Sequence, residues 1–572
     1  MISISGKKWI FPKFDERKVL TIKQKFEVSD ALARILSLRD LSLDDITTFL
    51  YPKIKDLLPN PSLLLDMDAG IQRMVSAIMN HEKIVIYGDY DVDGATSVAL
   101  LYRYFEEFGV KLQYYIPDRL SEGYGVNKCA IQKICQTGAS LIVMVDCGTT
   151  SIAEVKMAKS LGTDSIILDH HSASVELPDS IAVINPHRID QHFVPHIAQL
   201  CAAGVVFLFL VGLQRELKKI NFFSQNVPNL LKYCDLVALG TICDIMPLRG
   251  LNRAFVKVGL EIIRQSAGLK ELINIAGIKE KISATHVSFA IGPRINAGGR
   301  VGSSLYGVQL LTTHDSIEAK EIAIKLNQLN EERQHLEQKI LEEAITQIES
   351  AELYQHSTIL ICNNSWHVGL IGIVASRLKE RYHRPCFVAS FDSTGVAKGS
   401  ARSVTGVDVG QLIHQAVQEG ILICGGGHSM AGGFSIMQEK LTDFYTFLNS
   451  HTFEFMEHYQ PTIEIDVELS FPSVSLAREL QKLEPFGVGN PMPRFCFNRM
   501  QPIAVNNIGT NHLQCIFVNE TRQKLNAIAF RSHGTKLGNA MTAKKVMSVV
   551  GTLKEHPYSG NVQLFIEDVV LV

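Results

Sequence analysis

Long apolar runs are missing from this 572-residue chain. The most apolar stretch, Ala198 to Leu213, covers 16 residues, which is shorter than the ~20 residues that span a bilayer. The segment from Met1 to Trp9 lacks the apolar core of a secretory signal peptide. We therefore expect neither a membrane segment nor secretion, and residues 198–213 are expected to form a buried core helix.

Cysteine occurs in a pattern that excludes two common roles. The 11 cysteines are odd in number and scattered, and no two of them form a Cys-x-x-Cys pair. This pattern excludes a disulfide framework and a thiol-rich zinc site. Free thiols fit a reducing compartment, so the expected location is the cytoplasm.

An excess of charge of either sign is also absent. Lys and Arg total 56 and Asp and Glu total 58, so the formal net charge is −2. A protein that coats duplex DNA through a broad basic surface would carry a clear positive excess. Charges act mainly at contact range in salt. A net charge near zero therefore still allows a basic channel beside an acidic site.

What the chain does contain is an alternation of strands and helices from residue 83 to about residue 185. The apolar runs expected to be strands are 83–88, 111–116, 141–145, 164–168 and 181–184. Such alternation is typical of a parallel sheet with crossover helices, so the predicted fold class is α/β. Residues 198–315 are expected to be mostly helical and to close on a Gly-rich loop, Gly292–Arg300.

The length allows three or four domains at about 150 residues each. The predicted order is a helical lead-in (1–80), a catalytic α/β domain (81–315), a connecting helix (316–350), a second α/β domain (351–455) and a small C-terminal β-barrel (456–572). The connecting helix is predicted from Leu and Ile at near-helical spacing without Gly or Pro. The barrel is predicted from short, regularly spaced strands such as 513–518 and 546–550.

Acidic residues and histidines directly follow three of the expected strands. They are Asp89, Asp91 and Asp93 after 83–88, Asp146 after 141–145, and Asp169, His170 and His171 after 164–168. The carboxyl ends of parallel strands share one edge of a sheet, and ligands bind in the crevice there. Carboxylates crowded at that edge would repel each other unless cations neutralised them. The pattern therefore predicts a divalent-metal site and a hydrolase of phosphate esters.

Other interpretations of these residues differ in strength. Asp89 to Gly94 matches the start of a calcium-binding EF-hand loop, but the twelfth residue is Leu100 where a Glu is required, and a strand precedes the motif. Calcium storage is therefore rejected, whereas an ordinary solvated turn remains open. Asp244 lies in an apolar helical stretch, where it is either a helix-end cap or a carboxylate that meets a cation.

The ligand types indicate which metal binds. Mixed carboxylates and imidazoles favour Mn²⁺ or Mg²⁺. A carboxylate shared by two such ions gives a two-metal centre with the ions ~3.5–4 Å apart. Asp169 is expected to accept an N–H of the His170 ring and so to fix its tautomer.

Four motifs occur in a recognisable order, namely Tyr-Gly-Asp-Tyr-Asp-Val-Asp-Gly, Val-Asp-Cys-Gly, Asp-His-His and Cys-Asp-Ile-Met-Pro-Leu. In this order and spacing they resemble the DHH phosphoesterase superfamily. Further segments resemble the RecJ family of bacterial single-strand-specific 5′ exonucleases; they are Gly292–Arg300, Trp366–Gly372, Gly399–Ser403, Gly425–His428 and Glu484–Pro491. The resemblance runs from about residue 30 to the C-terminus.

This resemblance implies roles for the acidic residues and the histidines. Asp89 and Asp91 would face one metal, and Asp93, His170 and Asp244 the other, with Asp146 bridging the two ions. His171 would contact the scissile phosphate, and Asp169 would orient its neighbours. The three folded parts would be a DHH catalytic domain, a DHHA1-like domain and an OB-fold that binds single strands.

The resemblance also implies contacts to phosphate and to the DNA strand. Ser400 and Arg402 resemble the family's 5′-phosphate contacts, and a fork-shaped guanidinium suits that role. The loop containing Gly426, Gly427 and His428 would allow close approach to phosphate oxygens, although it could also be a plain turn. Arg119, Arg294 and Arg300 are candidates for strand contacts, with a purely structural role as the alternative.

The implied function is a two-metal exonuclease that degrades single-stranded DNA from the 5′ end and releases 5′ mononucleotides. The implied setting is recombinational and mismatch repair, with a single-strand-binding protein and a repair helicase as partners of a monomeric enzyme. One alternative is a DHH enzyme for short oligonucleotides or cyclic dinucleotides, which would usually lack the C-terminal barrel. Another is a non-catalytic nucleic-acid-binding scaffold, which would have lost metal ligands; the sequence lacks none.

Overall fold

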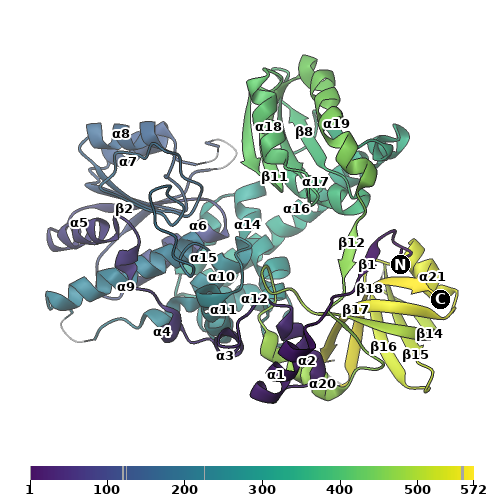
Figure 1. The fold of residues 1–572 in the computed structure, drawn as a ribbon. Coiled ribbons are helices and arrows are strands. Elements are labelled where there is room, and N and C mark those ends of the chain that lie inside the picture. The colour runs from purple at the N-terminus through teal and green to yellow at the C-terminus, as the bar shows by residue number, and fades with distance from the viewer. Residues whose placement is uncertain (1, 119–121, 124, 224–225, 510, 556–559) are drawn as a thin grey trace. The chain divides into compact units, whose positions relative to one another are not determined.

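The computed structural model describes residues 2–118, 122–123, 125–223, 226–509, 511–555 and 560–572. The chain folds into two compact units (Figure 1). Unit 1 comprises residues 1–299, 303–327 and 462–572, and unit 2 comprises residues 300–302 and 328–461. Within the described ranges, no helix combines the length and the apolar character that crossing a membrane requires.

Unit 1 contains a five-stranded parallel sheet in the order β3-β2-β4-β5-β6. Its strands are β2 (Ile84–Gly88), β3 (Gln113–Tyr115), β4 (Leu141–Val145), β5 (Asp164–Leu168) and β6 (Ala182–Ile184). All five predicted strands are therefore confirmed. They were recognisable because strands that are buried on both faces are continuous apolar runs.

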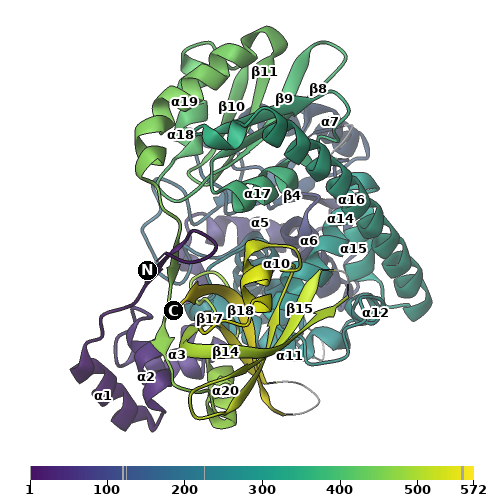
Figure 2. The same ribbon diagram turned by 90° about the vertical axis from the view of Figure 1, so that its right-hand side faces the viewer.

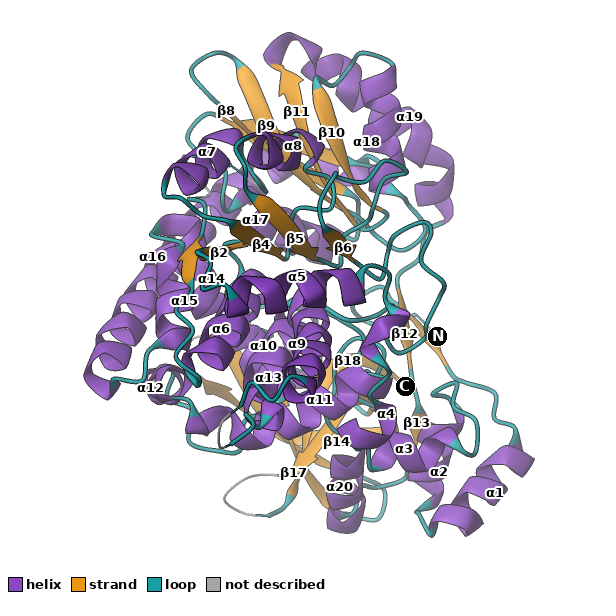
Figure 3. Ribbon diagram, turned by 90° about the vertical axis from the view of Figure 1, so that its left-hand side faces the viewer, coloured by secondary structure: helices purple, strands orange, loops and turns teal. Residues whose placement is uncertain are grey.

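Helices cover both faces of this sheet (Figure 3). One face packs on α7 (Lys128–Gln136) and α8 (Ile152–Ser160). The other face packs on α5 (Met67–Met79), α6 (Val92–Glu106) and α9 (Ala202–Lys219). The predicted buried core helix is α9, in which twelve residues are buried.

Further helices extend the core on the α9 side of the sheet. They are α10 (Cys234–Cys243), α11 (Gly250–Ile262), α12 (Ala267–Ile275), α13 (Ala284–His286), a π-helix (Val287–Ile291), α14 (Gly292–Val301) and α15 (Leu305–Thr312), followed by α16 (Ser316–Ser350). The single connecting helix predicted over 316–350 is thus confirmed, since α16 has these bounds.

The Gly-rich segment 292–300 is a helix, and the predicted loop is wrong. Its glycines allow close packing against neighbouring elements. A Cβ atom at Gly292 would lie 2.4 Å from Cys243 Sγ, and one at Gly299 would lie 3.2 Å from the backbone oxygen of Tyr90. The glycines therefore bring α14 against the segments that carry Asp244 and Asp89, rather than breaking the helix.

The C-terminal part of unit 1 is a closed barrel of five strands, which confirms the predicted small β-barrel. The strands are β14 (Arg494–Ile508), β15 (His512–Val518), β16 (Lys524–Ala529), β17 (Met547–Glu555) and β18 (Val562–Leu571), and the β14–β17 pairing closes the ring. The additional elements are β13 (Val467–Glu468), α20 (Val474–Leu480), a 3₁₀ turn (Gln481–Leu483) and α21 (Lys536–Thr542).

The N-terminal segment shares its core with this barrel (Figure 2). It contains β1 (Lys8–Ile10), α1 (Glu16–Phe26), α2 (Asp30–Ser37), α3 (Asp45–Leu50) and α4 (Ile54–Leu57). Strand β1 pairs in parallel with β12 (Thr462–Glu464). Residues from both ends of the chain therefore form one hydrophobic cluster, which a purely helical lead-in did not anticipate.

Unit 2 contains a mixed sheet in the order β10-β11-β9-β8-β7. The strands are β7 (Ile359–Asn363), β8 (Cys386–Phe391), β9 (Val396–Arg402), β10 (Cys424–His428) and β11 (Ala431–Met437), with helices α17 (Ile371–Tyr382), α18 (Val409–Gln418) and α19 (Leu441–His458). The predicted loop at 425–428 is wrong, because this segment is the edge strand β10. Gly425 allows β10 to pack against α18, since a Cβ atom there would lie 2.6 Å from Ile413.

Candidate metal centre

The predicted metal ligands of unit 1 follow strand or helix ends at one edge of the parallel sheet. Asp89 directly follows β2, Asp146 directly follows β4, and Asp169 directly follows β5. Asp91 is the N-cap of α6, and Asp93 lies in its first turn. Asp244 is the C-cap of α10, as the helix-end interpretation predicted.

The ligand atoms form three overlapping groups, each within 4.8 Å. The groups are Asp89, Asp91 and Asp146; Asp93, His170 and Asp244; and Asp146, His170 and His171. The His170 Nε2 atom is 3.3 Å from Asp146 Oδ1 and 3.5 Å from Asp244 Oδ2. Side chains from separate segments of the chain thus converge on one small volume.

Several polar atoms in these groups are buried without hydrogen bonds. In the part of the chain that the structure describes, Asp146 Oδ1, Asp244 Oδ2 and both ring nitrogens of His170 have no hydrogen-bond partner. Buried polar atoms are normally satisfied, so these atoms require another partner. A carboxylate-rich set with one or two imidazoles suits Mn²⁺ or Mg²⁺, and the residues therefore fit divalent cations.

The electrostatics of the cluster lead to the same conclusion. Burial and the charges of Asp93, Asp91 and Asp89 raise the pKa of Asp146 well above its usual value. Burial and a neighbouring carboxylate also raise the pKa of Asp93 to about 6 and that of Asp244 to about 8. Carboxylates held this close together favour protonation, and bound cations would reverse that preference.

Backbone amides fix the positions of two ligands. The Oδ1 atom of Asp91 accepts hydrogen bonds from the amides of Asp93 and Gly94 at the start of α6. The two carboxylate oxygens of Asp93 accept from the amides of Ala202 and Ala203 at the N-terminus of α9, at 2.6 and 3.0 Å. The partial positive charge of that helix end stabilises the buried carboxylate. The contact joins residues more than 100 positions apart, and no sequence signal indicated it.

Asp169 holds His171, and the prediction that it would hold the His170 ring is wrong. The Oδ1 atom of Asp169 lies 2.8 Å from His171 Nδ1, whereas it contacts His170 only through the backbone amide. Burial disfavours the charged form of the His171 ring. The hydrogen bond to Asp169 and the negative charge of Asp169 outweigh that effect and raise the pKa of His171 to about 9. Burial and the neighbouring His171 lower the pKa of His170 to about 4, which leaves that ring neutral, as a metal ligand must be.

A second layer of residues was missed by the sequence reasoning. Asn185 Nδ2 donates to Thr149 Oγ1 and to the backbone oxygen of His171, at 2.8 and 2.9 Å. A ring nitrogen of His187 contacts the backbone oxygen of His170. Asn185 directly follows β6, so the rule that strand ends carry functional residues could have identified this segment.

Unit 2 brings the predicted phosphate-binding residues together on one sheet. Ser400 pairs with Gly433, which pairs with Gly426, and Arg402 is connected to His428 through Ala431 in the same way. Residues directly opposite each other point to the same face, so Arg402 and His428 share a face. Arg402 Nη1 donates to Ser400 Oγ at 3.1 Å, and burial lowers the pKa of Arg402.

The N-terminus of α17 lies against this pair of side chains. A Cβ atom at Gly372, in the first turn of α17, would lie 3.0 Å from Ser400 Oγ and 3.2 Å from Arg402 Nη2. A half-buried guanidinium beside a helix N-terminus forms a positive site that suits a phosphate group.

Two of the remaining arginine candidates, Arg294 and Arg300, donate hydrogen bonds to other parts of the protein. Arg294 Nε donates to Asn327 Oδ1 at 3.0 Å and Nη1 to the backbone oxygen of Ala290 at 2.8 Å. Arg300 Nη1 donates to the backbone oxygen of Gly369 at 2.8 Å. These contacts give both residues a structural role, and contacts to a DNA strand stay a prediction. Arg119 lies outside the described residues.

Three family models match the chain. The DHH family N-terminal domain matches residues 83–241, the DHHA1 domain matches residues 354–452, and the RecJ OB domain matches residues 463–568. The first match runs from β2 into α10, and it includes most of the metal-ligand candidates.

Known proteins are similar over almost the whole chain. The single-stranded-DNA-specific exonuclease RecJ of Bacillus subtilis (strain 168) is 34% identical over an alignment of 577 residues. The alignment covers 99% of this chain and 71% of the relative. The crystal structure of RecJ in complex with Mn²⁺ from Thermus thermophilus has a TM-score of 0.81 at 28% identity, covering 99% of this chain and 80% of that chain. The Mg²⁺ complex from the same source has a TM-score of 0.73 at 26% identity, covering 98% and 78%.

These similarities confirm the α/β fold with DHH, DHHA1 and OB domains and the resemblance inferred from the motifs. The chain belongs to the RecJ family of single-stranded-DNA-specific exonucleases.

Proposed function

We propose that this protein is a metal-dependent exonuclease that degrades single-stranded DNA from the 5′ end and releases 5′ mononucleotides. The observation that carries the proposal is the convergence of seven side chains into overlapping ligand groups at the edge of the sheet. Membership of the RecJ family supports the substrate and the type of reaction.

In this proposal the residues divide between two ions, and the ions are Mn²⁺ or Mg²⁺, because related structures are complexes with Mn²⁺ and with Mg²⁺. Asp89 and Asp91 would hold one ion, Asp93, His170 and Asp244 would hold the other, and Asp146 would be shared by the two sites. When bound, two such ions activate water and stabilise the leaving oxygen in phosphodiester hydrolysis. The protein's own contribution is to hold the ligands in place through the backbone contacts of Asp91 and Asp93.

His171 has a separate task at the phosphate. In the metal-free protein, the Asp169 hydrogen bond and charge raise the pKa of His171 to about 9, which favours the protonated ring at neutral pH. Asp169 Oδ1 lies 2.8 Å from His171 Nδ1 and so orients the ring. We assign its Nε2–H to a non-bridging oxygen of the scissile phosphate, where a preorganised donor stabilises the charge that develops. Asp169 acts as a positioning residue, because its carboxylate is occupied by His171 and by the amide of Thr149.

The preference for a 5′ end is assigned to unit 2. Ser400, Arg402 and His428, with the backbone of Gly426 and Gly427, would bind the terminal 5′-phosphate. A guanidinium that lies beside a helix N-terminus recognises a phosphate better than a neutral end. Arg294, Arg300 and Arg119 are assigned to the strand itself, as weaker candidates.

The biological setting is part of the proposal. Single-strand degradation from a 5′ end serves recombinational and mismatch repair, with a helicase that opens the duplex and a single-strand-binding protein as partners. All eleven cysteines are free and lie among the described residues, which fits the reducing cytoplasm. We assign the active form to a monomer.

One assay tests the proposed function. End-labelled DNA and RNA strands of either polarity, and matched duplexes, are incubated with Mn²⁺ and then with a chelator. We expect labelled mononucleotides from the 5′ end of single-stranded DNA, little cleavage of duplex and none after chelation. Cleavage of dinucleotides alone would indicate a short-oligonucleotide phosphodiesterase, and binding without cleavage would indicate a scaffold. Either result would contradict the proposal.

A further inference from the structure

The turn that follows β6, residues 185–187, lies beside the two histidines of the metal centre. Strand β6 pairs in parallel with β5, so the segments that follow these strands, 185–187 and 169–171, leave the sheet side by side. Asn185 and His187 are not among the metal-ligand candidates. Each of them nevertheless contacts a backbone oxygen of the histidine pair. This turn therefore supports the segment that carries both rings.

His187 holds the backbone of His170. One ring nitrogen of His187 hydrogen-bonds to the backbone oxygen of His170. A metal-binding histidine is normally oriented by a partner on its second ring nitrogen, but within the described residues neither ring nitrogen of His170 has a hydrogen-bond partner. The direction of the His170 ring therefore depends on how its backbone is held, at the amide by Asp169 at 2.8 Å and at the oxygen by His187.

The other ring nitrogen of His187 faces the segment that leads into α9. The Nε2 atom lies 2.9 Å from the backbone oxygen of Ala198, and α9 begins shortly afterwards, at Ala202. The N-terminal amides of this helix hold the Asp93 carboxylate. His187 thus links the segments that position Asp93 and His170, two members of the same ligand group.

Asn185 holds the second histidine of the pair. It is 1% exposed, and its Nδ2 atom donates to the backbone oxygen of His171 at 2.9 Å and to Thr149 Oγ1 at 2.8 Å. The Thr149 amide in turn donates to Asp169, the carboxylate that orients the His171 ring. Asn185 Oδ1 also accepts from the His187 amide at 2.7 Å, so the two side chains form one connected unit.

We propose that Asn185 and His187 are positioning residues of the metal centre with separate tasks. His187 sets the place of the metal-binding His170 relative to Asp93, and Asn185 sets the place of His171 at the scissile phosphate. The task of Asn185 rests on the proposed function, because it needs a phosphate at His171. A metal site works only when its ligands are held within about 0.5 Å of the productive geometry, and these two residues supply that restraint through the backbone.

Calorimetric titration of Mn²⁺ into the metal-free full chain measures the task of His187. His187→Ala should weaken Mn²⁺ binding about tenfold, the usual effect of losing a residue that orients a metal ligand. A higher Mn²⁺ concentration should therefore restore most of the turnover of single-stranded DNA. His187→Gln keeps an N–H donor for one of the two backbone oxygens and should recover part of the affinity.

Asn185→Ala should give the opposite result. Its Mn²⁺ affinity should stay within about threefold of the wild-type value, because His187 still holds His170. Its kcat should fall at least about tenfold with an unchanged KM, since the His171 donor acts on the charge that develops in the transition state. Added Mn²⁺ should not restore kcat. If Asn185→Ala does not fold, Thr149→Val removes only the hydroxyl that accepts from Asn185 and should lower kcat in the same way but less.

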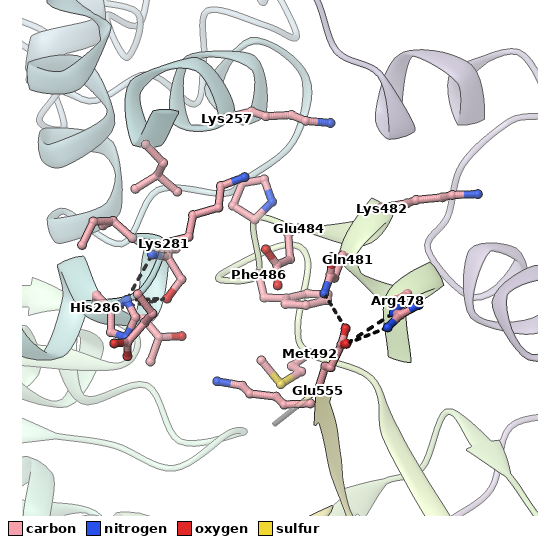
Figure 4. A pocket seen from close by; sticks show the side chains of 18 of the residues that line it. Lys257, Lys281, His286, Arg478, Gln481, Lys482, Glu484, Phe486, Met492 and Glu555 are labelled. Carbon is pink, nitrogen blue, oxygen red and sulfur yellow. Dashed lines mark hydrogen bonds and ion pairs between the residues drawn. The ribbon is translucent and has the colours of Figure 1, made fainter. Parts of the chain in front are cut away.

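His286→Ala is the matched control for loss of a histidine. Its ring is also contacted at both nitrogens, by the Ser283 amide at 3.2 Å and by Glu280 Oε1 at 3.2 Å. Figure 4 shows His286 beside a cavity of about 780 Å³ in unit 1, and no metal-ligand candidate is among the described residues that line this cavity. Distant sites act independently, so His286→Ala should keep the wild-type Mn²⁺ affinity within about twofold.

Each outcome decides one of the two tasks. Wild-type Mn²⁺ affinity in His187→Ala overturns the task of His187, and wild-type kcat in Asn185→Ala overturns that of Asn185. If both variants lose affinity and kcat alike, in step with a fall in Tm, the turn only stabilises the fold and the proposal is wrong. If the wild-type chain does not degrade single strands, the proposed function fails, and the Mn²⁺ titration still decides whether His187 holds His170.

Discussion

Asp146 is the residue on which the metal centre depends most. It belongs to two of the three ligand groups, and its Oδ1 atom is buried 3.3 Å from His170 Nε2. Burial and four neighbouring carboxylates raise its pKa. In a carboxylate cluster of this kind, the central charge is the one that the cations must neutralise.

Asp146→Asn should reduce turnover of single-stranded DNA by at least about a thousandfold, because the amide removes a charge that two ions would share. Strand affinity should remain within about threefold, since contacts outside the metal centre dominate binding. Asp164→Asn is the matched control: Asp164 lies at the opposite end of the sheet, where it pairs with Arg73 at 2.7 Å. Near-normal turnover in Asp146→Asn would contradict the metal assignment.

The raised pKa values predict how stability depends on pH in the metal-free protein. The pKa values of Asp244, about 8, and His171, about 9, lie above their ordinary values, so the folded chain binds more protons than the unfolded chain near pH 7–8. Stability should therefore fall as pH rises from about 6.5 to 8.5. The pKa of His170 is lowered to about 4, so this group makes stability rise with pH. Its effect is confined to pH values below the ordinary pKa of histidine.

Calorimetry in chelator at about pH 6.5, 7.5 and 8.5 measures this effect as a falling Tm. Mn²⁺ should raise Tm most at the highest pH, because protons compete with the metal for the carboxylates. A Tm that is constant or rises over this range without metal would contradict the proposed repulsion.

At the scale of elements, Arg253 connects three segments of unit 1. It is 1% exposed and donates to the backbone oxygens of Phe49 in α3 and of residues 482–485 before the barrel. Its guanidinium also lies 4.0 Å from the centre of the Phe49 ring. One side chain on α11 thus fixes both α3 and the segment that precedes the barrel.

Arg253→Met should lower the free energy of unfolding by about 3 kcal/mol, because five carbonyl oxygens lose a charged donor in a buried site. Urea unfolding gives the value directly. Arg381→Met, at an arginine whose side chain is 52% exposed, should change stability by less than about 0.5 kcal/mol. Equal effects of the two substitutions would mean that Arg253 does not connect these segments.

Some of the helices and strands could be predicted from the sequence, and others could not. The strands β2 to β6 and the helix α16 were predictable because burial and periodicity are local in the chain. The runs 292–300 and 425–428 were interpreted as loops because of their glycines, yet these glycines permit close contacts with Cys243 and Ile413. Such contacts are set by packing between distant segments, which local pattern does not reveal.

The metal centre also combines residues that local pattern could predict with contacts that only the packing of distant segments sets. Asp89, Asp146 and Asp169 were identifiable because each directly follows a strand. The amides of Ala202 and Ala203, which hold Asp93, depend on how α9 packs and could not be inferred. The assignment of each ligand to a particular ion and the predicted domain boundaries stay predictions.

At the scale of the whole molecule, the two ends of the chain stabilise each other in unit 1. Val19, Ile22 and Leu36 share one hydrophobic cluster with barrel residues such as Phe495 and Val549. The carboxylate of Glu479 accepts from the Ser29 amide at 3.0 Å. The barrel is therefore part of the structural core of the N-terminal segment as well as a candidate DNA-binding module.

A chain that ends at residue 460 should expose the apolar faces of α1 and α2. Trypsin should then cut within residues 1–50 at least about tenfold faster than in the full chain, because cleavage follows the population of the opened segment. The rate of cleavage within unit 2 serves as the internal control. Equal protection of residues 1–50 in both chains would show that the N-terminal segment folds without the barrel.

The most direct test of the central claim is anomalous diffraction at the manganese edge from crystals grown with Mn²⁺. We expect two peaks about 3.5–4 Å apart, one beside Asp89 and Asp91, the other beside Asp93, His170 and Asp244, and Asp146 in contact with both. Crystals without a peak at this edge of the sheet, or with peaks only at other positions, would contradict the account.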